Sequence, residues 1–407
     1  MTDPAFKRTI ALLAALRIAP ALIVLAGNGR SLPALPGYGY GRPAGDTYGF
    51  YAAAREFISA WTQLSKPLAG VAVLLLGGGA AGVHLLWRRR RKGEAVALAA
   101  AALGIFLSVG IHEMGPTGAG AVGWPIVWSL PLFPLRVAGA LGYHGAYYLG
   151  IAILLLCNVV TIAATALIAR RLVPGRLALL APALLVVWPF LMRELEGTGN
   201  GVYGAWLDDS GLLLYAEPLS TALVVTALAL VILRRSDAFA AALAGGLLAF
   251  SVAVRISNVT TAAVVFVVLV FAASRRAAIL FTLACAGAAT VAAVFWSRGY
   301  AGFKNHPSDQ APDGLFSWHY VLRSWRDSTV FDWKMLVLLL PLPLIGVLAL
   351  RRRGYESWLL AGVVLVTAAF YSPYYITALH PRFLFVALPP LFVLSAVGVE
   401  RLAALRR

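Results

Sequence analysis

The chain has 407 residues, of which 60% are apolar and 13% are charged, and it carries a formal net charge of +17. So large an apolar share excludes an ordinary soluble globular protein and indicates a polytopic membrane protein. The basic residues fall in short clusters between apolar runs, so the charge is interpreted as a topology signal and not as a nucleic-acid-binding surface.

The apolar runs predict an all-α membrane protein of about twelve transmembrane helices, with interfacial helices in the outer loops. Residues 1–407 are expected to form one transmembrane domain without a separate soluble domain, and the first run is expected to be a retained helix. The expected spans are Ile10–Ala26, Pro67–Trp87, Ala95–Ile111, Ala146–Ala169, Leu177–Leu191, Leu212–Leu233, Ala238–Val254, Val259–Ala273, Ala277–Trp296, Met335–Leu350, Trp358–Tyr375 and Phe383–Leu402.

Basic clusters mark one side of this arrangement. Each short connection on that side carries lysine or arginine, as in Arg88–Lys92 and Arg351–Arg353. The positive-inside rule then predicts that both termini lie in the cytoplasm of a cell whose plasma membrane the chain spans.

The connections on the other side are much longer, and loops of such length are usually functional. They are Gly27–Lys66, His112–Gly145, Met192–Gly211 and Ser297–Lys334. Five of the six histidines lie on or near this outer face, namely His112, His144, His306, His319 and His380. The chemistry is therefore expected on the outer, periplasmic face.

The first of these loops contains an amphipathic pattern within Gly41–Trp61. Its apolar stripe consists of Phe50, Tyr51, Ala54, Phe57, Ile58 and Trp61. This spacing predicts a helix lying in the membrane interface, with its aromatic side chains among the lipid headgroups. Asp46 stands at the N-terminal end of the helix, where it is either an N-cap or a catalytic carboxylate.

The sequence has no P-loop, no Rossmann fingerprint and no histidine spacing typical of a metal site. We therefore expect no cofactor and no metal. A reaction on the outer face cannot use cytoplasmic nucleotide donors, and a substrate carried by a lipid would remove that difficulty.

Four stretches together resemble the GT-C superfamily of membrane glycosyltransferases. They are GDTYGFYAAAREF around Asp46, WPIVWSLPLFPL at Trp124–Leu135, LYAEPL at Leu214–Leu219 and HPRFLF at His380–Phe385. The resemblance implies inverting transfer of mannose or a pentose from a polyprenyl-phosphate donor to a hydroxyl of a lipid-linked or cell-envelope glycan. The partners are then this donor, the glycan or glycolipid acceptor and membrane lipids, with no nucleic acid.

The resemblance also implies roles for particular residues. Asp46 would be the catalytic base, and Arg382, His380 and Arg255 would bind the donor phosphate. The candidates for substrate binding are Glu217, His112, Glu113 and Tyr48. Two alternatives stay open, because Arg255 could be a snorkelling arginine and Glu217 could belong to a structural ion pair.

Two other functions compete with this hypothesis. A polymerase or ligase of the O-antigen type also acts outside on lipid-linked glycans, and Ser297–Lys334 could be its large late loop. For His306, His319, Arg323 and Arg326 in this loop, phosphate binding and a solvated loop face both stay open. A twelve-helix transporter should show two related halves and ionisable residues near the bilayer midplane. Few such residues lie within the expected spans, with Arg17 and His84 the main ones, which disfavours transport.

Overall fold

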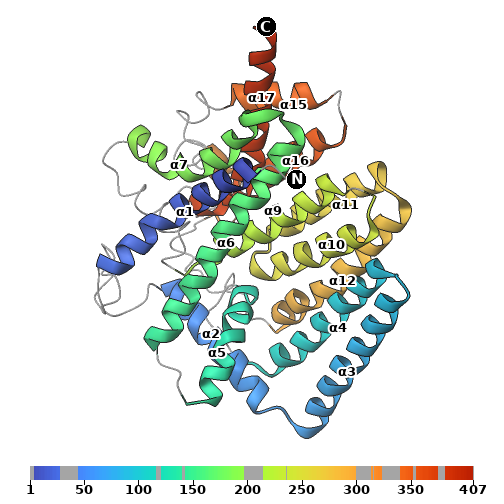
Figure 1. Ribbon diagram of the computed structural model, residues 1–407. Helices are drawn as coiled ribbons and strands as arrows, with labels where there is room; N and C mark the ends of the chain where they lie inside the picture. Colours follow the sequence, from blue (N-terminus) through green and yellow to red (C-terminus); the bar gives the residue numbers. More distant parts are fainter. Residues whose placement is uncertain are drawn as a thin grey trace. The chain divides into compact units, whose positions relative to one another are not determined.

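The structure is a computed structural model that describes residues 4–27, 45–115, 121–139, 143–196, 214–234, 236–298, 313–314, 316–322, 340–351, 354–374 and 381–406. These residues form helices, together with one isolated antiparallel bridge between Phe316 and Tyr374 (Figure 1). The predicted all-α class is confirmed.

Every apolar run predicted as a span overlaps a helix, and α10 (Ala238–Val254) matches its prediction at both ends. In the described part of the chain, five helical stretches are long and apolar enough to cross a membrane. They are α3 (Lys66–Arg88), α4 (Lys92–Glu113), Gly145–Leu172 within α6 (Tyr143–Leu172), α12 (Arg275–Ser297) and Phe383–Leu405. A membrane protein is thus supported, whereas the number of twelve spans is not confirmed.

The chain divides into two compact units, each built from separate stretches of sequence. Unit 1 contains residues 1–27, 154–212 and 306–407, and unit 2 contains residues 28–153 and 213–305. Helix α6 passes from unit 2 into unit 1. The predicted site residues occur in both units.

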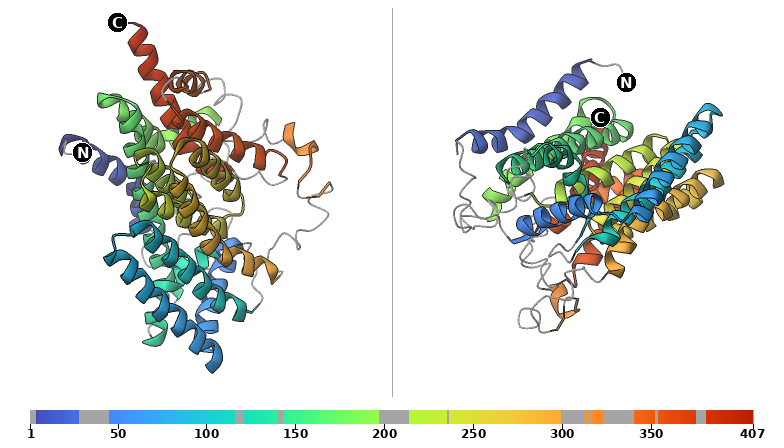
Figure 2. Two further views of the ribbon diagram at one scale, coloured as in Figure 1. Left: turned by 90° about the vertical axis from the view of Figure 1, so that its right-hand side faces the viewer. Right: turned by 90° about the horizontal axis from the view of Figure 1, so that it is seen from below.

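Three helices that run in the same direction form the centre of unit 2, namely α4, α10 and α12 (Figure 1 and Figure 2). Near their N-terminal ends, Ala97, Ala242 and Ala284 pack together. Near their C-terminal ends, the shared cluster contains Ile111, Val252 and Val291 among others. Such small side chains allow close helix packing in a membrane protein.

Helices α4 and α12 approach each other closely at a point where a glycine on one helix faces a glycine on the other. A Cβ built on Gly104 would lie 2.1 Å from the carbonyl oxygen of Gly287, and a Cβ on Gly287 would lie 2.5 Å from Cα of Ala101. No side chain fits at either position. Helix α3 runs antiparallel to α4, because Gly79 meets Ala102 and Gly82 meets Leu98.

The remaining helices of unit 2 lie around this centre. Helix α9 (Glu217–Leu233) leads into α10 through a short turn in which Arg234 pairs with Asp237 at 3.5 Å. Helix α11 (Asn258–Ala272) follows α10 after the turn at Arg255, and it packs beside α10 and α12. Glu94 near the start of α4 accepts a 2.7 Å hydrogen bond from Arg276 near the start of α12. The clusters at Arg88–Lys92, Arg234 and Arg275–Arg276 therefore share one end of unit 2, called here the basic end.

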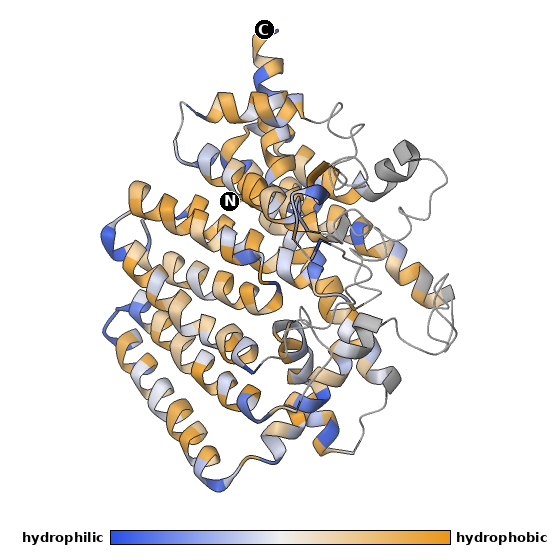
Figure 3. Ribbon diagram, turned by 180° about the vertical axis from the view of Figure 1, so that it is seen from behind, coloured by the Kyte–Doolittle hydropathy of each residue, from blue (hydrophilic) through white to orange (hydrophobic). Residues whose placement is uncertain are grey.

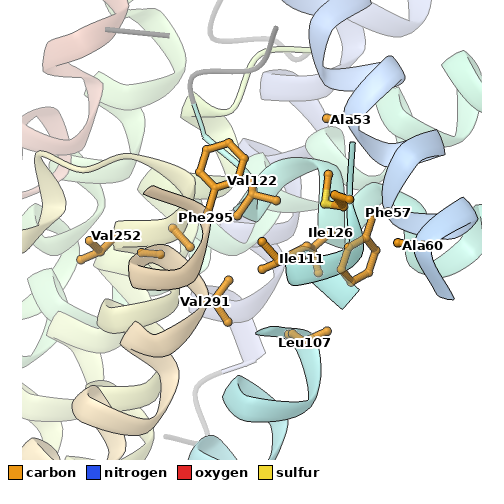
Figure 4. Close-up of a cluster of buried hydrophobic side chains, with 13 residues drawn as sticks. Ala53, Phe57, Ala60, Leu107, Ile111, Val122, Ile126, Val252, Val291 and Phe295 are labelled. Carbon is orange, nitrogen blue, oxygen red and sulfur yellow. The ribbon is translucent and has the colours of Figure 1, made fainter. Parts of the chain in front are cut away.

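Helix α2 (Gly45–Thr62) corrects one expectation. Its predicted apolar stripe does not enter the headgroup region, because α4 and α5 (Gly123–Val137) cover it. Phe57 is 3% exposed and packs with Ile111 and Ile126 (Figure 4). The stripe thus forms part of the protein core. This arrangement fixes α2 at the end of unit 2 opposite the basic end.

Unit 1 contains α1 (Pro4–Gly27), the later part of α6, η1 (Gly175–Leu179), α7 (Leu180–Glu196), α15 (Pro341–Leu350), α16 (Glu356–Tyr371), η4 (Pro381–Ala387) and α17 (Leu388–Leu405). Arg17 on α1 donates a buried 3.2 Å hydrogen bond to Asn158 on α6. Helices α15 and α17 approach closely, because a Cβ on Gly346 would lie 2.0 Å from the carbonyl oxygen of Leu394. Trp188 on α7 packs edge-on against Phe385 of η4.

Candidate functional site

Glu217 and Arg255 form an ion pair at the end of unit 2 opposite the basic end. Oε1 of Glu217 accepts a hydrogen bond from Nη1 of Arg255, and the Glu217 side chain is only 4% exposed while that of Arg255 is 19% exposed. Glu217 begins α9 and Pro218 follows it, a combination typical of a helix start. Glu217 therefore takes part in an ion pair with Arg255.

Hydrogen bonds next to this pair hold the start of α11. Nδ2 of Asn258 donates to Oγ of Ser220 at 2.8 Å and to the carbonyl oxygen of Ser251 at 3.0 Å. The backbone amide of Asn258 also donates to the carbonyl oxygen of Arg255 at 3.1 Å. These bonds join α9, α10 and α11, so the backbone around Arg255 is held on both sides. The sequence alone gives no signal for Asn258 or Ser220, because a serine and an asparagine 38 residues apart form no local motif.

The segment before Glu217 has an unusual backbone. Leu214 has φ +55°, a conformation that a side chain of this size rarely adopts. Nε1 of Trp124 donates a 2.7 Å hydrogen bond to the carbonyl oxygen of Leu214 and thereby stabilises it. Backbone held in this way is often found at functional sites. Both predicted motifs, at Trp124–Leu135 and Leu214–Leu219, therefore meet at this point.

Aromatic contacts extend from Trp124 to α2. Trp124 stacks on Trp128 with ring centroids 5.5 Å apart, and Trp128 lies 5.6 Å from Tyr51 of α2. Nε1 of Trp128 donates to the carbonyl oxygen of Ala146 at 2.8 Å. At the start of α5, a Cβ on Gly123 would lie 2.6 Å from the amide nitrogen of Val254, so no side chain fits at this position between α5 and α10. This part of unit 2 is tightly packed.

Asp46 is the second residue of α2, so it lies in the first turn of that helix and not before it. A rise of 1.5 Å per residue places it about 7.5 Å along the helix axis from Tyr51. Tyr48 lies in the same turn. The structure describes the backbone of both residues but not their side chains.

His112 and Glu113 end α4 and are exposed. Nε2 of His112 lies 3.9 Å from Oε1 of Glu113, and the two side chains are 60% and 36% exposed. They share the end of unit 2 that carries α2 and the Glu217–Arg255 pair. Among the residues that the structure describes, no group of three histidine, cysteine, aspartate or glutamate side chains is close enough to hold a metal ion.

The other predicted phosphate ligands belong to unit 1. Arg382 is the second residue of η4, where only its backbone is described, and His380 lies outside the described residues.

Unit 1 also contains a polar contact in the last long loop. Nδ1 of His319 lies 3.2 Å from Oδ2 of Asp313, and both side chains are exposed. The hydroxyl of Tyr320 accepts a 3.1 Å hydrogen bond from the amide of Asp313. Nearby, Phe316 packs on Tyr374 with ring centroids 5.0 Å apart, and Tyr374 contacts Phe383 of η4. This loop segment is thereby tied to the start of the last helix.

The arrangement in unit 2 combines a compensated buried charge pair, a held backbone and a helix that begins with an acidic residue. Comparisons of the chain with protein-family models, curated proteins and solved structures gave no significant match.

Proposed function

We propose that the chain is a membrane glycosyltransferase that moves mannose or a pentose from a polyprenyl-phosphate donor to a glycan hydroxyl. The acceptor oxygen attacks the anomeric carbon, the bond from that carbon to the phosphate oxygen breaks, and Asp46 takes the hydroxyl proton. Polyprenyl phosphate leaves with the bonding electron pair. General base catalysis of this kind typically contributes about 10²- to 10⁴-fold to the rate.

The placement of Asp46 is the observation that supports this proposal most. Asp46 stands in the first turn of a helix whose apolar face is buried against α4 and α5. A catalytic group needs such a rigid support, because small displacements of a base cost much of its effect. The helix also lies at the same end of unit 2 as the Glu217–Arg255 pair.

The remaining roles follow from chemistry. Arg382 and His380 supply donor-phosphate contacts, since a guanidinium fork matches phosphate oxygens. Arg255 retains 19% exposure beside Glu217, so it is the third phosphate candidate, with its charge partly compensated. Glu217, His112, Glu113 and Tyr48 are the groups assigned to the acceptor.

The test is the Asp46→Asn variant. Asparagine keeps the size and much of the hydrogen bonding of aspartate but cannot take a proton. We expect transfer to fall by about 10²-fold or more, while loss of the carboxylate from the first turn of α2 costs at most about 1 kcal/mol. The measurement is transfer of labelled sugar from polyprenyl-phosphate mannose or arabinofuranose by the purified protein. The thermal stability of the same protein is recorded alongside.

Glu56→Gln is the matched control, because Glu56 is an exposed carboxylate on the same helix. We expect this variant to transfer sugar at the normal rate. A stable Asp46→Asn protein with wild-type transfer would exclude Asp46 as the base.

The His319–Asp313 contact favours a second candidate, a polymerase or ligase that joins lipid-linked glycans. An aspartate that accepts a hydrogen bond from Nδ1 orients the imidazole and leaves its Nε2 for a substrate. In that case His319→Gln would abolish joining of lipid-linked glycans, whereas Asp46→Asn would retain it.

A further inference from the structure

A groove lies between α11 and α12 of unit 2, near the basic end and on an outward-facing side. Its volume is about 610 Å³, within the usual range for ligand sites. The residues lining it are Phe266, Val270, Ala273, Arg275, Ala278, Ile279, Thr282 and Leu283. All but two of these are apolar, and the hydroxyl of Thr282 is already used in a 2.9 Å hydrogen bond to the carbonyl oxygen of Ala278.

Arg275 supplies a charge at one end of this apolar groove. At the basic end, Arg91 and Arg276 share Glu94, and Arg234 pairs with Asp237. Within the described part of the chain, no acidic side chain pairs with Arg275. Arg275 also opens α12, whose N-terminus carries partial positive charge, and Ser274 caps that helix at the amide of Ala277.

The residues around the groove are exposed and apolar, as contact with a lipid tail requires. Helix α12 is one of the five candidate spans, and Val270, Ile279 and Leu283 are each about half exposed beside the groove. The helices of unit 2 are hydrophobic along their length, while hydrophilic residues gather in the turns (Figure 3). An amphiphile with a negative headgroup and a hydrocarbon chain fits both parts, since basic pockets between membrane helices bind anionic headgroups.

The groove is remote from the proposed reaction. Phe295, twenty residues beyond Arg275 on α12, packs in the cluster that contains Val252 near Arg255. At 1.5 Å per residue, this separation is about 30 Å along α12. A lipid whose phosphate rests at Arg275 therefore lies at the opposite end of unit 2 from the Glu217–Arg255 pair, so the groove does not serve as the donor site.

From these observations we infer that the groove between α11 and α12 binds an anionic glycerophospholipid. The phosphate contacts the Arg275 guanidinium at the start of α12, and one acyl chain lies along Ile279 and Leu283. This site is independent of the proposed transfer reaction, and its test requires no activity.

The test is lipid binding by the full chain in detergent, measured by native mass spectrometry. Phosphatidylglycerol and phosphatidylcholine with identical acyl chains are titrated separately. We expect phosphatidylglycerol to bind roughly fivefold more tightly than phosphatidylcholine, because one arginine near an anionic headgroup strengthens binding by about that factor. Arg275→Gln should remove this preference, whereas Arg89→Gln, which changes another exposed arginine at the basic end, should retain it.

A second variant tests the hydrocarbon part. Thr282→Trp places a large ring in the groove and should weaken binding of both lipids, while Leu74→Trp on the exposed face of α3 should not. Inorganic phosphate should fail to displace the lipid. A wild-type protein without the headgroup preference, an Arg275→Gln protein that keeps it, or a Thr282→Trp protein with unchanged binding would overturn the proposal. Preferential binding of polyprenyl phosphate would also overturn it, because the ligand would then be of the donor class.

Discussion

The Glu217–Arg255 pair joins two residues that are 38 positions apart and largely removed from solvent. Burial of either charge alone is costly, and the pair is stable because each side chain compensates the other. Neither residue shows this partnership in the sequence. Glu217 appears there only as an acid at a helix start, and Arg255 as a cation in a turn.

Removing one partner should therefore destabilise the protein. We expect Arg255→Gln to lower the free energy of unfolding by about 3 kcal/mol, the lower end for a broken buried pair, since Arg255 keeps some exposure. The measurement is equilibrium unfolding in mixed micelles. The double variant with Glu217→Gln should lose clearly less than the two single losses combined, because both charges disappear together. Fully additive losses would show that the pair contributes nothing as a pair.

Arg382 tests the donor-phosphate part of the proposed function. Arg382→Lys keeps the charge but loses the planar two-pronged donor geometry, so donor use should weaken. Arg382→Ala should weaken it further, and both effects should be seen in the concentration dependence on polyprenyl-phosphate sugar. Unchanged donor affinity and turnover in Arg382→Ala would move the phosphate contact to Arg255 or to the loop of residues 297–334.

At the scale of elements, the contact between α4 and α12 depends on glycine. Gly104→Ala and Gly287→Ala each place a Cβ within 2.5 Å of the other helix, so the helices must separate. We expect each change to cost about 1–3 kcal/mol, as for overpacked cores. Thermal unfolding of the purified variants measures this loss.

Helix α3 offers the matched control for this prediction. A Cβ on Gly77 or Gly78 meets nothing within 4 Å, because that side of α3 has no neighbour in the described structure. Gly77→Ala should therefore leave stability unchanged or raise it by up to about 1 kcal/mol through helix propensity. Equal losses at Gly77 and Gly104 would mean that close packing does not explain the effect.

At the scale of the whole molecule, orientation in the membrane decides which side holds the reaction. Ser65 and Arg89 flank α3 and are both exposed, with Ser65 at the end that carries α2 and Arg89 at the basic end. In a background with Cys157 and Cys285 replaced by alanine, Ser65→Cys should react with an impermeant thiol reagent in intact cells, and Arg89→Cys should react only after permeabilisation. The reverse labelling would place the Glu217–Arg255 pair in the cytoplasm and exclude the proposed lipid-linked reaction outside.

The sequence by itself determined the class of the protein and the positions of its helices along the chain. Apolar runs between basic clusters and helix-breaking residues are local signals, and for this reason α10 was predicted at both ends and the turn at Arg255 was found. Hydropathy could not decide how many helices span the membrane, because a helix buried in protein and a helix facing lipid have the same composition.

The tertiary structure alone decided which residues meet. The stripe on α2 looked suited to lipid, but remote segments in α4 and α5 cover it. The partner of Glu217 and the hydrogen bond that holds Leu214 likewise arise from segments far apart in the chain. Periodicity records how apolar a helix face is but not which neighbour covers it, since that depends on packing among all the helices of a unit.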